Sequence, residues 1–347
     1  MDLELKAQVQ SLIGDLGKVE DIQKLFGEAS YRIYYRIKLN DGKTLIVMKT
    51  PPGIQSASEE ITNYQGTKNE PPFLNIQRYL AAHELPVPQV LATDLNNGLI
   101  LLQDLGDKTF EKLLENCNDG MRLFFYKQAI DLLLKFQKTG EQFHDAECMA
   151  FKRSFDLNLL TWEFDHFLEY GIEDRFGIKI PAADKQKMQE LGLKMIQPIV
   201  EIPYGLTHRD YQSRNLMFYG YDFYLIDFQD ALLGPPQYDM VALLRDSYVE
   251  LPFATVEVLL DTYLAGRKKV GLSEVDSNEF KNNFHRITLQ RKLKDAGRFQ
   301  YIFKMKGNPN FLPHLPTSLR YVKQAFVELP EYHELQGILG KYVKELL

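Results

Sequence analysis

Three polar residues of one short run, His208, Asp210 and Asn215, have the types and spacing needed for phosphoryl transfer. They fit the pattern H-x-D-x-x-x-x-N, in which the Asp accepts the proton of a substrate hydroxyl and the Asn binds Mg²⁺. Twelve positions after Asn215, the run Asp227-Phe228-Gln229-Asp230 stands where such sites carry a second metal carboxylate. We therefore predict Asp210 as the catalytic base and Asn215 and Asp227 as metal ligands.

The segment between these two runs predicts how they meet in space. Two short apolar and aromatic runs, 216–219 and 223–226, flank the turn Gly220-Tyr221-Asp222. A regular hairpin centred on Tyr221 places Asn215 opposite Asp227, with Cα atoms roughly 4.5 to 5.5 Å apart. Their oxygens can then reach one hard cation. The alternative, that these residues only form turns and helix caps, leaves their spacing unexplained.

Length and composition favour a chain with two lobes. The 347 residues, 45% of them hydrophobic, suffice for two packed units. Strand-like patterns prevail in the first hundred residues and helix-like patterns in the remainder, with the change near Gly106. We expect an α+β fold, with a nucleotide-binding lobe over 1–105 and a catalytic, substrate-binding lobe over 106–347.

The same composition argues against several classes of function. The 47 acidic and 41 basic residues give a net charge of -6 without a basic block, which argues against a nucleic-acid partner. Only Cys117 and Cys148 occur, too few for a disulfide framework or a thiolate metal site. A secretion signal and a long apolar span are both lacking. We expect a cytoplasmic protein without a membrane or an obligate protein partner.

A hairpin near the N-terminus offers a lysine for the phosphates. Segments 31–39 and 44–49 bracket Asn40-Asp41-Gly42-Lys43, a strong hairpin signal. Val47 and Lys49 share a face of the second strand because side chains alternate. We expect Val47 to lie over the adenine of ATP and Lys49 to reach the phosphates. The alternative for Lys49 is a charged edge-strand residue that discourages aggregation.

Other parts of a nucleotide site are signalled less strongly. The turn Gly27-Glu28-Ala29-Ser30 precedes the hairpin, and we expect Ser30 to contact the phosphates, although one glycine does not make a glycine-rich loop. The helix expected over 73–83 has no internal Glu to pair with Lys49, so Glu70, Glu59 or Glu60 would substitute.

The connector between the lobes is expected after a short buried strand, 98–103. Backbone groups from Gln103 to Leu105 would bond the adenine edge, although an ordinary strand and turn would have the same sequence. A strongly apolar helix over 121–138, ended by Gly140, is expected to form the core of the second lobe.

The combined pattern resembles the aminoglycoside phosphotransferase and choline kinase superfamily, which has the bilobal protein-kinase-like fold. It is most similar to the bacterial anomeric kinases for N-acetylmuramate and N-acetylglucosamine of cell-wall recycling. The resemblance covers most of the chain from about residue 27. The stretches that carry it are 101–107, 207–216, 225–231, Gly234-Pro235, 238–246 and 289–299.

The resemblance implies roles for individual residues. Asp210 would be the base, Asn215 and Asp227 would hold Mg²⁺, and Lys49 would bind the phosphates of ATP. His208 and Asp239 would support the catalytic loop, with the Asp accepting bonds from its backbone.

The acceptor is the longest inference from the sequence. Arg214 suits an anionic acceptor such as N-acetylmuramate better than a polycationic aminoglycoside, and Arg291 and Lys292 are also available. An ion pair from Arg214 to a carboxylate such as Asp230 is the alternative. The acidic stretch from Asp156 to Asp174 is either a solvated helical face or a pocket for cations. Within it, Glu163 matches a position of the amino-sugar kinases and is expected to bond sugar hydroxyls.

The sequence thus predicts transfer of the ATP γ-phosphoryl group to a small-molecule hydroxyl, most simply the anomeric one of an N-acetylated amino sugar. Rival enzyme readings are an antibiotic phosphotransferase and a choline, homoserine or fructosamine kinase. A nucleotide-binding pseudokinase is the rival outside catalysis.

Overall fold

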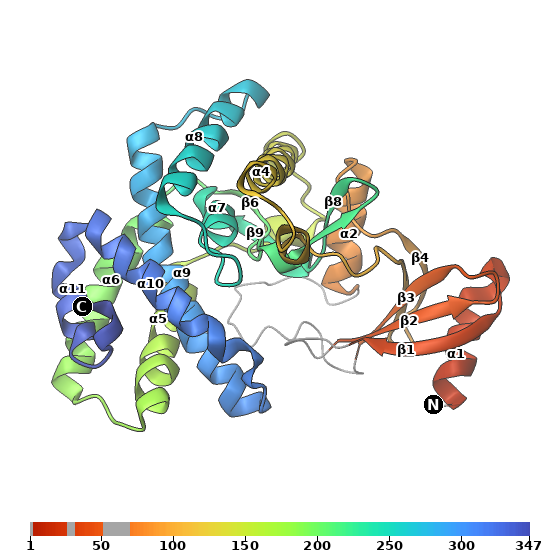
Figure 1. The fold of residues 1–347 in the computed structure, drawn as a ribbon, viewed down its shortest axis with the longest axis horizontal. Coiled ribbons are helices and arrows are strands. Elements are labelled where there is room, and N and C mark those ends of the chain that lie inside the picture. Colours follow the sequence, from red (N-terminus) through yellow and green to blue (C-terminus); the bar gives the residue numbers. More distant parts are fainter. Residues whose placement is uncertain (1–2, 26–31, 51–69) are drawn as a thin grey trace.

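A five-stranded antiparallel sheet forms the N-terminal part of the computed structural model, which describes residues 3–25, 32–50 and 70–347 (Figure 1). Its strand order is β1-β2-β3-β5-β4. The strands are β1 (Val19–Leu25), β2 (Ile33–Leu39), β3 (Thr44–Lys49), β4 (Val90–Asp94) and β5 (Leu99–Gln103). The turn between β2 and β3 is the predicted hairpin, with Gly42 at a φ of 85°.

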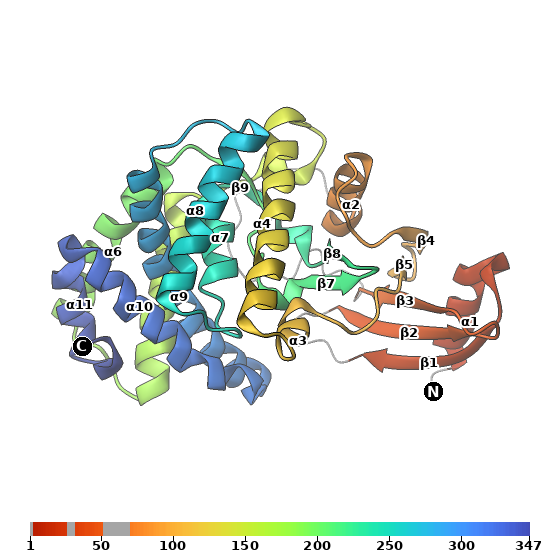
Figure 2. The same cartoon turned by 45° about the horizontal axis from the view of Figure 1, so that its top comes forward.

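The two faces of this sheet belong to different cores. Helix α1 (Leu3–Ile13) covers one face and, with Val47, Leu99 and Leu101, forms a small separate core. On the other face Met48, Ile100 and Leu102 join the large core of the helical part. Figures 1 and 2 show α1 on the side of the sheet turned away from the helical part.

Helix α2 (Pro72–Ala82) links the sheet to the helical part. Its buried stripe, Phe73, Ile76, Gln77 and Leu80, is the one expected from the sequence. Phe73 stacks on Phe228, with 5.1 Å between the ring centroids, directly after Asp227. The large core therefore runs across the expected boundary between residues 105 and 106, and a division there stays a proposal.

The rest of the chain is mostly helical (Figure 2). Its helices are α3 (Phe110–Leu114), α4 (Asp119–Gln142), α5 (Leu157–His166), α6 (Ala182–Val200), α7 (Gln237–Leu244), α8 (Phe253–Val270), α9 (Ser277–Lys306), α10 (Leu315–Glu328) and α11 (His333–Gly340). Helix α4 runs through Gly140 instead of ending there. A Cβ at Gly140 would lie 2.3 Å from the Cβ of Leu206, so this glycine permits close packing and is not a stop signal. Within the described residues, every helix is too short or too polar to span a bilayer.

Two short antiparallel strand pairs flank the predicted catalytic residues between these helices. Strand β6 (Gly205–Thr207) pairs with β9 (Leu232–Gly234), and β7 (Leu216–Tyr219) pairs with β8 (Asp222–Leu225). The catalytic loop, residues 208–215, connects β6 to β7. The segment of Asp227 connects β8 to β9, so each run joins one strand pair to the other.

Candidate active site

His208 fixes the start of the catalytic loop to the segment of Asp227. Its ring is fully buried, and its Nε2 lies 3.1 Å from the carbonyl oxygen of Ile226. Burial lowers the pKa of His208 to about 4, so the ring is neutral at pH 7. Because a carbonyl only accepts, Nε2 carries the proton and donates this bond.

Asp239 binds the backbone at the start of the catalytic loop. The amides of His208 and Arg209 donate to its two carboxylate oxygens at 2.8 and 2.9 Å. Arg209 has a φ of 77°, a conformation that costs energy for a non-glycine residue and needs such support. Burial raises the pKa of Asp239 to about 7 in spite of these bonds. The contacts fit the supporting roles expected of His208 and Asp239.

Asp210 projects into a cavity between cationic side chains. Its Oδ1 lies 3.1 Å from Nη2 of Arg291, whose Nη1 donates to the carbonyl of Arg209 at 2.6 Å. Burial disfavours ionisation of Asp210, but the charges of Arg291, Lys294 and Arg209 outweigh it. They hold the pKa of Asp210 well below its ordinary value. Asp210 is therefore a carboxylate at any neutral pH.

The hairpin after the loop has a different register from the one expected. Leu216 pairs with Leu225, and Gly220 and Tyr221 form a two-residue turn with φ values of 58° and 73°. Asn215 therefore lies opposite Ile226, whose amide donates to the carbonyl of Asn215 at 3.1 Å. The prediction that Asn215 faces Asp227 directly was wrong by one residue, because the turn has two residues instead of three.

Asn215 ends the loop, and Asp227 follows Ile226, which is bonded to Asn215. Nδ2 of Asn215 donates to the carbonyl of Asp210 at 2.9 Å, which leaves the amide oxygen as the free end for a cation. Asp227 has a left-handed backbone, with φ 62° and ψ 30°, and its half-buried carboxylate faces the cavity. Burial, together with the charges of Asp210 and Asp230, raises the pKa of Asp227. A carboxylate such as Asp227, whose charge is disfavoured by burial and by neighbouring carboxylates, suits a divalent cation.

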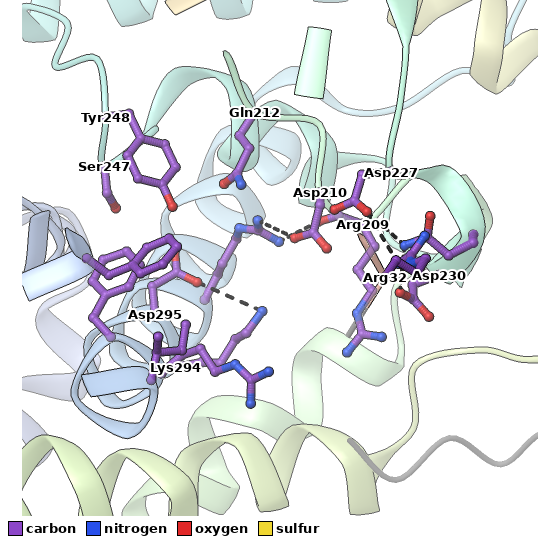
Figure 3. Close-up of a pocket in the computed structure, with 16 residues that line it drawn as sticks. Arg32, Arg209, Asp210, Gln212, Asp227, Asp230, Ser247, Tyr248, Lys294 and Asp295 are labelled. Carbon is purple, nitrogen blue, oxygen red and sulfur yellow. Dashed lines mark hydrogen bonds and ion pairs between the residues drawn. The ribbon is translucent and has the colours of Figure 1, made fainter. Parts of the chain in front are cut away.

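One cavity brings Asp210 and Asp227 together with a basic, aromatic wall, whereas Asn215 is not among the residues that line it (Figure 3). Asp210, Asp227, Asp230 and Arg32 gather at one end, whereas Tyr248, Ser247, Lys294 and Asp295 lie at the other. Helix α9 supplies much of this second wall. Its contribution is Arg291, Lys294, Asp295, Arg298, Phe299 and Ile302. Positions 291, 294, 298 and 302 recur at helical spacing, and this periodicity could have revealed the wall in the sequence.

Comparison with known sequences identifies the family of this chain. The profile of the phosphotransferase enzyme family matches residues 21–272. The chain belongs to this family. Membership confirms the expected kinase-like, ATP-dependent phosphotransferase with a small antiparallel sheet and a larger helical part.

Two relatives align with about 90% of this chain. An N-acetylmuramate/N-acetylglucosamine kinase of Pseudomonas putida is 32% identical over 319 residues, 90% of this chain and 86% of the relative. A protein of the same name from Pseudomonas aeruginosa is 29% identical over 314 residues, again 90% of this chain and 86% of the relative.

Solved structures share the fold at low sequence identity. A choline kinase from Cryptosporidium parvum has a TM-score of 0.64 and 11% identity, covering 97% of each chain. Amicoumacin kinase in complex with AMP-PNP and Ca²⁺ has a TM-score of 0.61 and 13% identity, covering 96% of this chain and 97% of its own. These likenesses support the kinase-like fold alone.

We expected Arg214 and Glu163 to line the cavity, but neither residue does. Arg214 donates to both carboxylate oxygens of Glu111, at 2.8 and 3.1 Å, and its guanidinium lies 3.7 Å from the ring centroid of Tyr248. It therefore forms an ion pair, though with Glu111 and not with Asp230.

Glu163 is fully buried, 3.6 Å from the guanidinium of Arg209, and accepts a bond from Gln290. It stands behind Arg209 and supports it, so the prediction that it bonds sugar hydroxyls was wrong for this geometry. The other carboxylates of the acidic stretch also lie elsewhere than on the described cavity wall. Glu173, for example, pairs with Lys179 and Lys185.

The structure contradicts some of the predicted ATP-binding residues and leaves others untested. Val47 is fully buried beneath α1, so it does not roof the cleft, and the prediction was wrong because alternation does not say which face a helix covers. Ser30, Glu59 and Glu60 lie outside the described residues. Glu70 is bonded to Arg78 at 2.7 Å. Gln103 ends β5, and adenine contacts at Gln103 and Leu105 stay a prediction.

Proposed function

We propose that this phosphotransferase transfers the γ-phosphoryl group of ATP to the anomeric hydroxyl of N-acetylmuramate, of N-acetylglucosamine, or of both. The observation that carries the proposal is the two-ended cavity, in which Asp210 belongs to a carboxylate end that faces a cationic, aromatic end. The names of relatives that match over about 90% of this chain point to the same acceptors.

The carboxylate end fits Mg²⁺ and the phosphates of ATP. We assign the metal to the carboxylate of Asp227 and the amide oxygen of Asn215, because hard oxygen ligands suit this ion. The metal would neutralise negative charge on the phosphates. Asn215 is oriented for this role by the bond from its Nδ2 to the carbonyl of Asp210.

Asp210 would orient the attacking hydroxyl. Its pKa lies well below the ordinary range, so it accepts a hydrogen bond at neutral pH but is a weak base early in the reaction. The proton then moves to Asp210 late, once the bond to phosphorus has largely formed. In such a site positioning and electrostatics supply most of the rate.

The second end of the cavity suits an N-acetylated sugar better than an aminoglycoside. Arg291, Lys294 and Arg298 line it, whereas a polycationic antibiotic requires carboxylates. Tyr248, Phe299 and Phe311 add apolar surface, which suits the carbon face of a sugar ring or an acetyl group. The cationic side chains also suit the lactyl carboxylate of N-acetylmuramate.

Three broader assignments accompany this proposal. The lobes divide between residues 105 and 106, with the adenine bonded by backbone groups from Gln103 to Leu105. A small-molecule acceptor is the partner, and neither nucleic acid nor an obligate protein partner takes part. The protein works in the cytoplasm, where ATP is available.

An acceptor screen tests the proposal. ATP consumption is measured with N-acetylmuramate, N-acetylglucosamine, kanamycin, choline and homoserine, at fixed Mg²⁺ and with an acceptor-free blank. We expect turnover with one or both sugars only. Phosphorylation of kanamycin with neither sugar accepted would establish an antibiotic phosphotransferase instead. ATP binding without turnover of any acceptor would favour a pseudokinase.

A further inference from the structure

Lys49, which we expected to bind the phosphates, lies on the face of the sheet that α1 covers. In the ladder between β3 and β5, Lys49 pairs with Leu99, and directly paired residues point to the same side. Leu99 is fully buried in the core beneath α1, as is Leu101, the partner of Val47. Lys49 therefore starts on the α1 face, away from Asp210 and Asp227.

A different cation of the sheet does reach the cavity. Arg32, directly before β2, lines the same cavity as Asp210, Asp227 and Asp230. Its Nη2 lies 3.6 Å from Oδ1 of Asp227, and its side chain is 19% exposed. Figure 3 shows Arg32 beside Asp227 and Asp230 at the carboxylate end.

The negative charges of the carboxylates and of the phosphates favour a cation from the sheet at this end. Asp227 serves the metal in the proposed function, and the phosphates bring several further negative charges. A guanidinium is planar, stays charged at any relevant pH and binds two phosphate oxygens at once. The charge is thus maintained where the phosphates would lie.

We propose that Arg32, and not Lys49, is the phosphate-binding cation of the sheet. The ion pair with Asp227 holds the guanidinium at the carboxylate end before the nucleotide binds. When metal and nucleotide are present, Asp227 serves the metal and Arg32 serves the phosphate oxygens. This inference rests on the proposed function, since it deepens the assignment of the nucleotide site.

Calorimetric titration without acceptor tests this inference, with ATP and Mg²⁺ in one series and adenosine in a second. The proteins are wild type, Arg32→Ala, Arg32→Lys and the matched control Lys49→Ala, each checked by thermal unfolding. Loss of a charge-assisted contact predicts that Arg32→Ala binds ATP about tenfold to a hundredfold more weakly. Its adenosine affinity should stay within about twofold, because adenosine lacks phosphates. Arg32→Lys should fall between, and Lys49→Ala should match wild type.

The outcomes that overturn the inference are distinct. A large loss of ATP affinity in Lys49→Ala with none in Arg32→Ala would return the role to the strand lysine. Equal losses for ATP and adenosine in Arg32→Ala would show a structural role only. Wild type that binds no ATP would overturn the proposed function together with this inference, whereas normal binding by both wild type and Arg32→Ala overturns this inference alone.

Discussion

Asp210 is the residue on which the chemistry depends most. We expect Asp210→Asn to lower kcat by roughly 10² to 10⁴-fold, the range for loss of a general base. The affinity for ATP should change little, because Asp210 faces the acceptor hydroxyl. Steady-state kinetics and nucleotide titration measure the two effects. The control is Asp222→Asn, an exposed carboxylate at the start of β8. Near-normal turnover of Asp210→Asn would remove this residue from the mechanism.

The buried ring of His208 should make the free energy of unfolding depend on pH. Its pKa falls from 6.5 in the unfolded chain to about 4 in the fold, so the unfolded state binds the proton first. The contribution of neutral His208 to the free energy of unfolding is present above pH 6.5 and is lost as the pH falls towards 4. Relative to His208→Gln, wild type should lose about 3 kcal/mol across this window. Urea denaturation of both proteins between pH 4 and 7.5 measures the difference, and parallel curves would contradict the assignment.

Sequence reasoning at the residue scale placed Asp210 and Asp227 at one cavity through their spacing, and their chemical roles stay predictions. The contacts of His208 and Asp239 agree with the supporting roles that the family resemblance implied. Sequence reasoning failed for Arg214 and Glu163, since a charged residue near a motif can face a buried partner as readily as a cavity. Burial and pairing depend on helices distant in the sequence, and single positions do not contain that information.

At the scale of elements, the packing of α4 against β6 is a sensitive contact behind the catalytic loop. The Cβ introduced by Gly140→Ala would lie 2.3 Å from the Cβ of Leu206, two residues before His208. Overpacking of this kind costs about 1 to 3 kcal/mol, more than the helix propensity gained. Chemical denaturation should show that loss. Gly120→Ala is the matched control in the same helix, with its nearest atom at 3.5 Å, and should be neutral or slightly stabilising. Equal effects of the two changes would refute the argument.

Several elements were predicted well, although α4 runs through its expected end at Gly140, and orientations were predicted less well. The β2–β3 hairpin and the stripe of α2 follow from local turn chemistry and periodicity. The β7–β8 register depended on a two-residue or a three-residue turn, and both are compatible with Gly220-Tyr221-Asp222. The alternation of β3 placed Val47 and Lys49 on one face correctly. It did not predict that α1, from the start of the chain, covers that face.

At the scale of the molecule, Arg36 ties the sheet to the connector that leads into the helical part. It donates to both carboxylate oxygens of Asp104, at 2.7 and 3.1 Å, and to Asp107 at 2.9 Å. Arg36→Ala should lower the free energy of unfolding by about 1.5 to 3 kcal/mol, because the carboxylate of Asp104 is only 5% exposed. Lys38 lies on the same strand as Arg36, and Lys38→Ala, which removes an exposed pair with Glu20, should cost less than about 1 kcal/mol. A comparable loss in both variants, measured by denaturation, would contradict this role.

The two-part architecture could be predicted from the sequence because composition changes along the chain and the catalytic run fixes the later part. The cationic wall on α9 could not be assigned with equal ease. Arg291 and Lys292 stand side by side in the sequence, but only Arg291 lines the cavity, whereas Lys292 bonds Ser247 and Asp295. Which residues of a buried helix face a site depends on how the whole molecule packs.

The position of the transferred phosphoryl group tests the central claim most directly. Purified protein is incubated with ATP, Mg²⁺ and N-acetylmuramate or N-acetylglucosamine, and the product is followed by phosphorus NMR and by mild acid hydrolysis. Asp210→Asn serves as the blank. The account predicts a sugar 1-phosphate, with phosphorus coupled to the anomeric proton and rapid release of phosphate in acid. An acid-stable 6-phosphate, or no sugar phosphate while another acceptor is turned over, would contradict it.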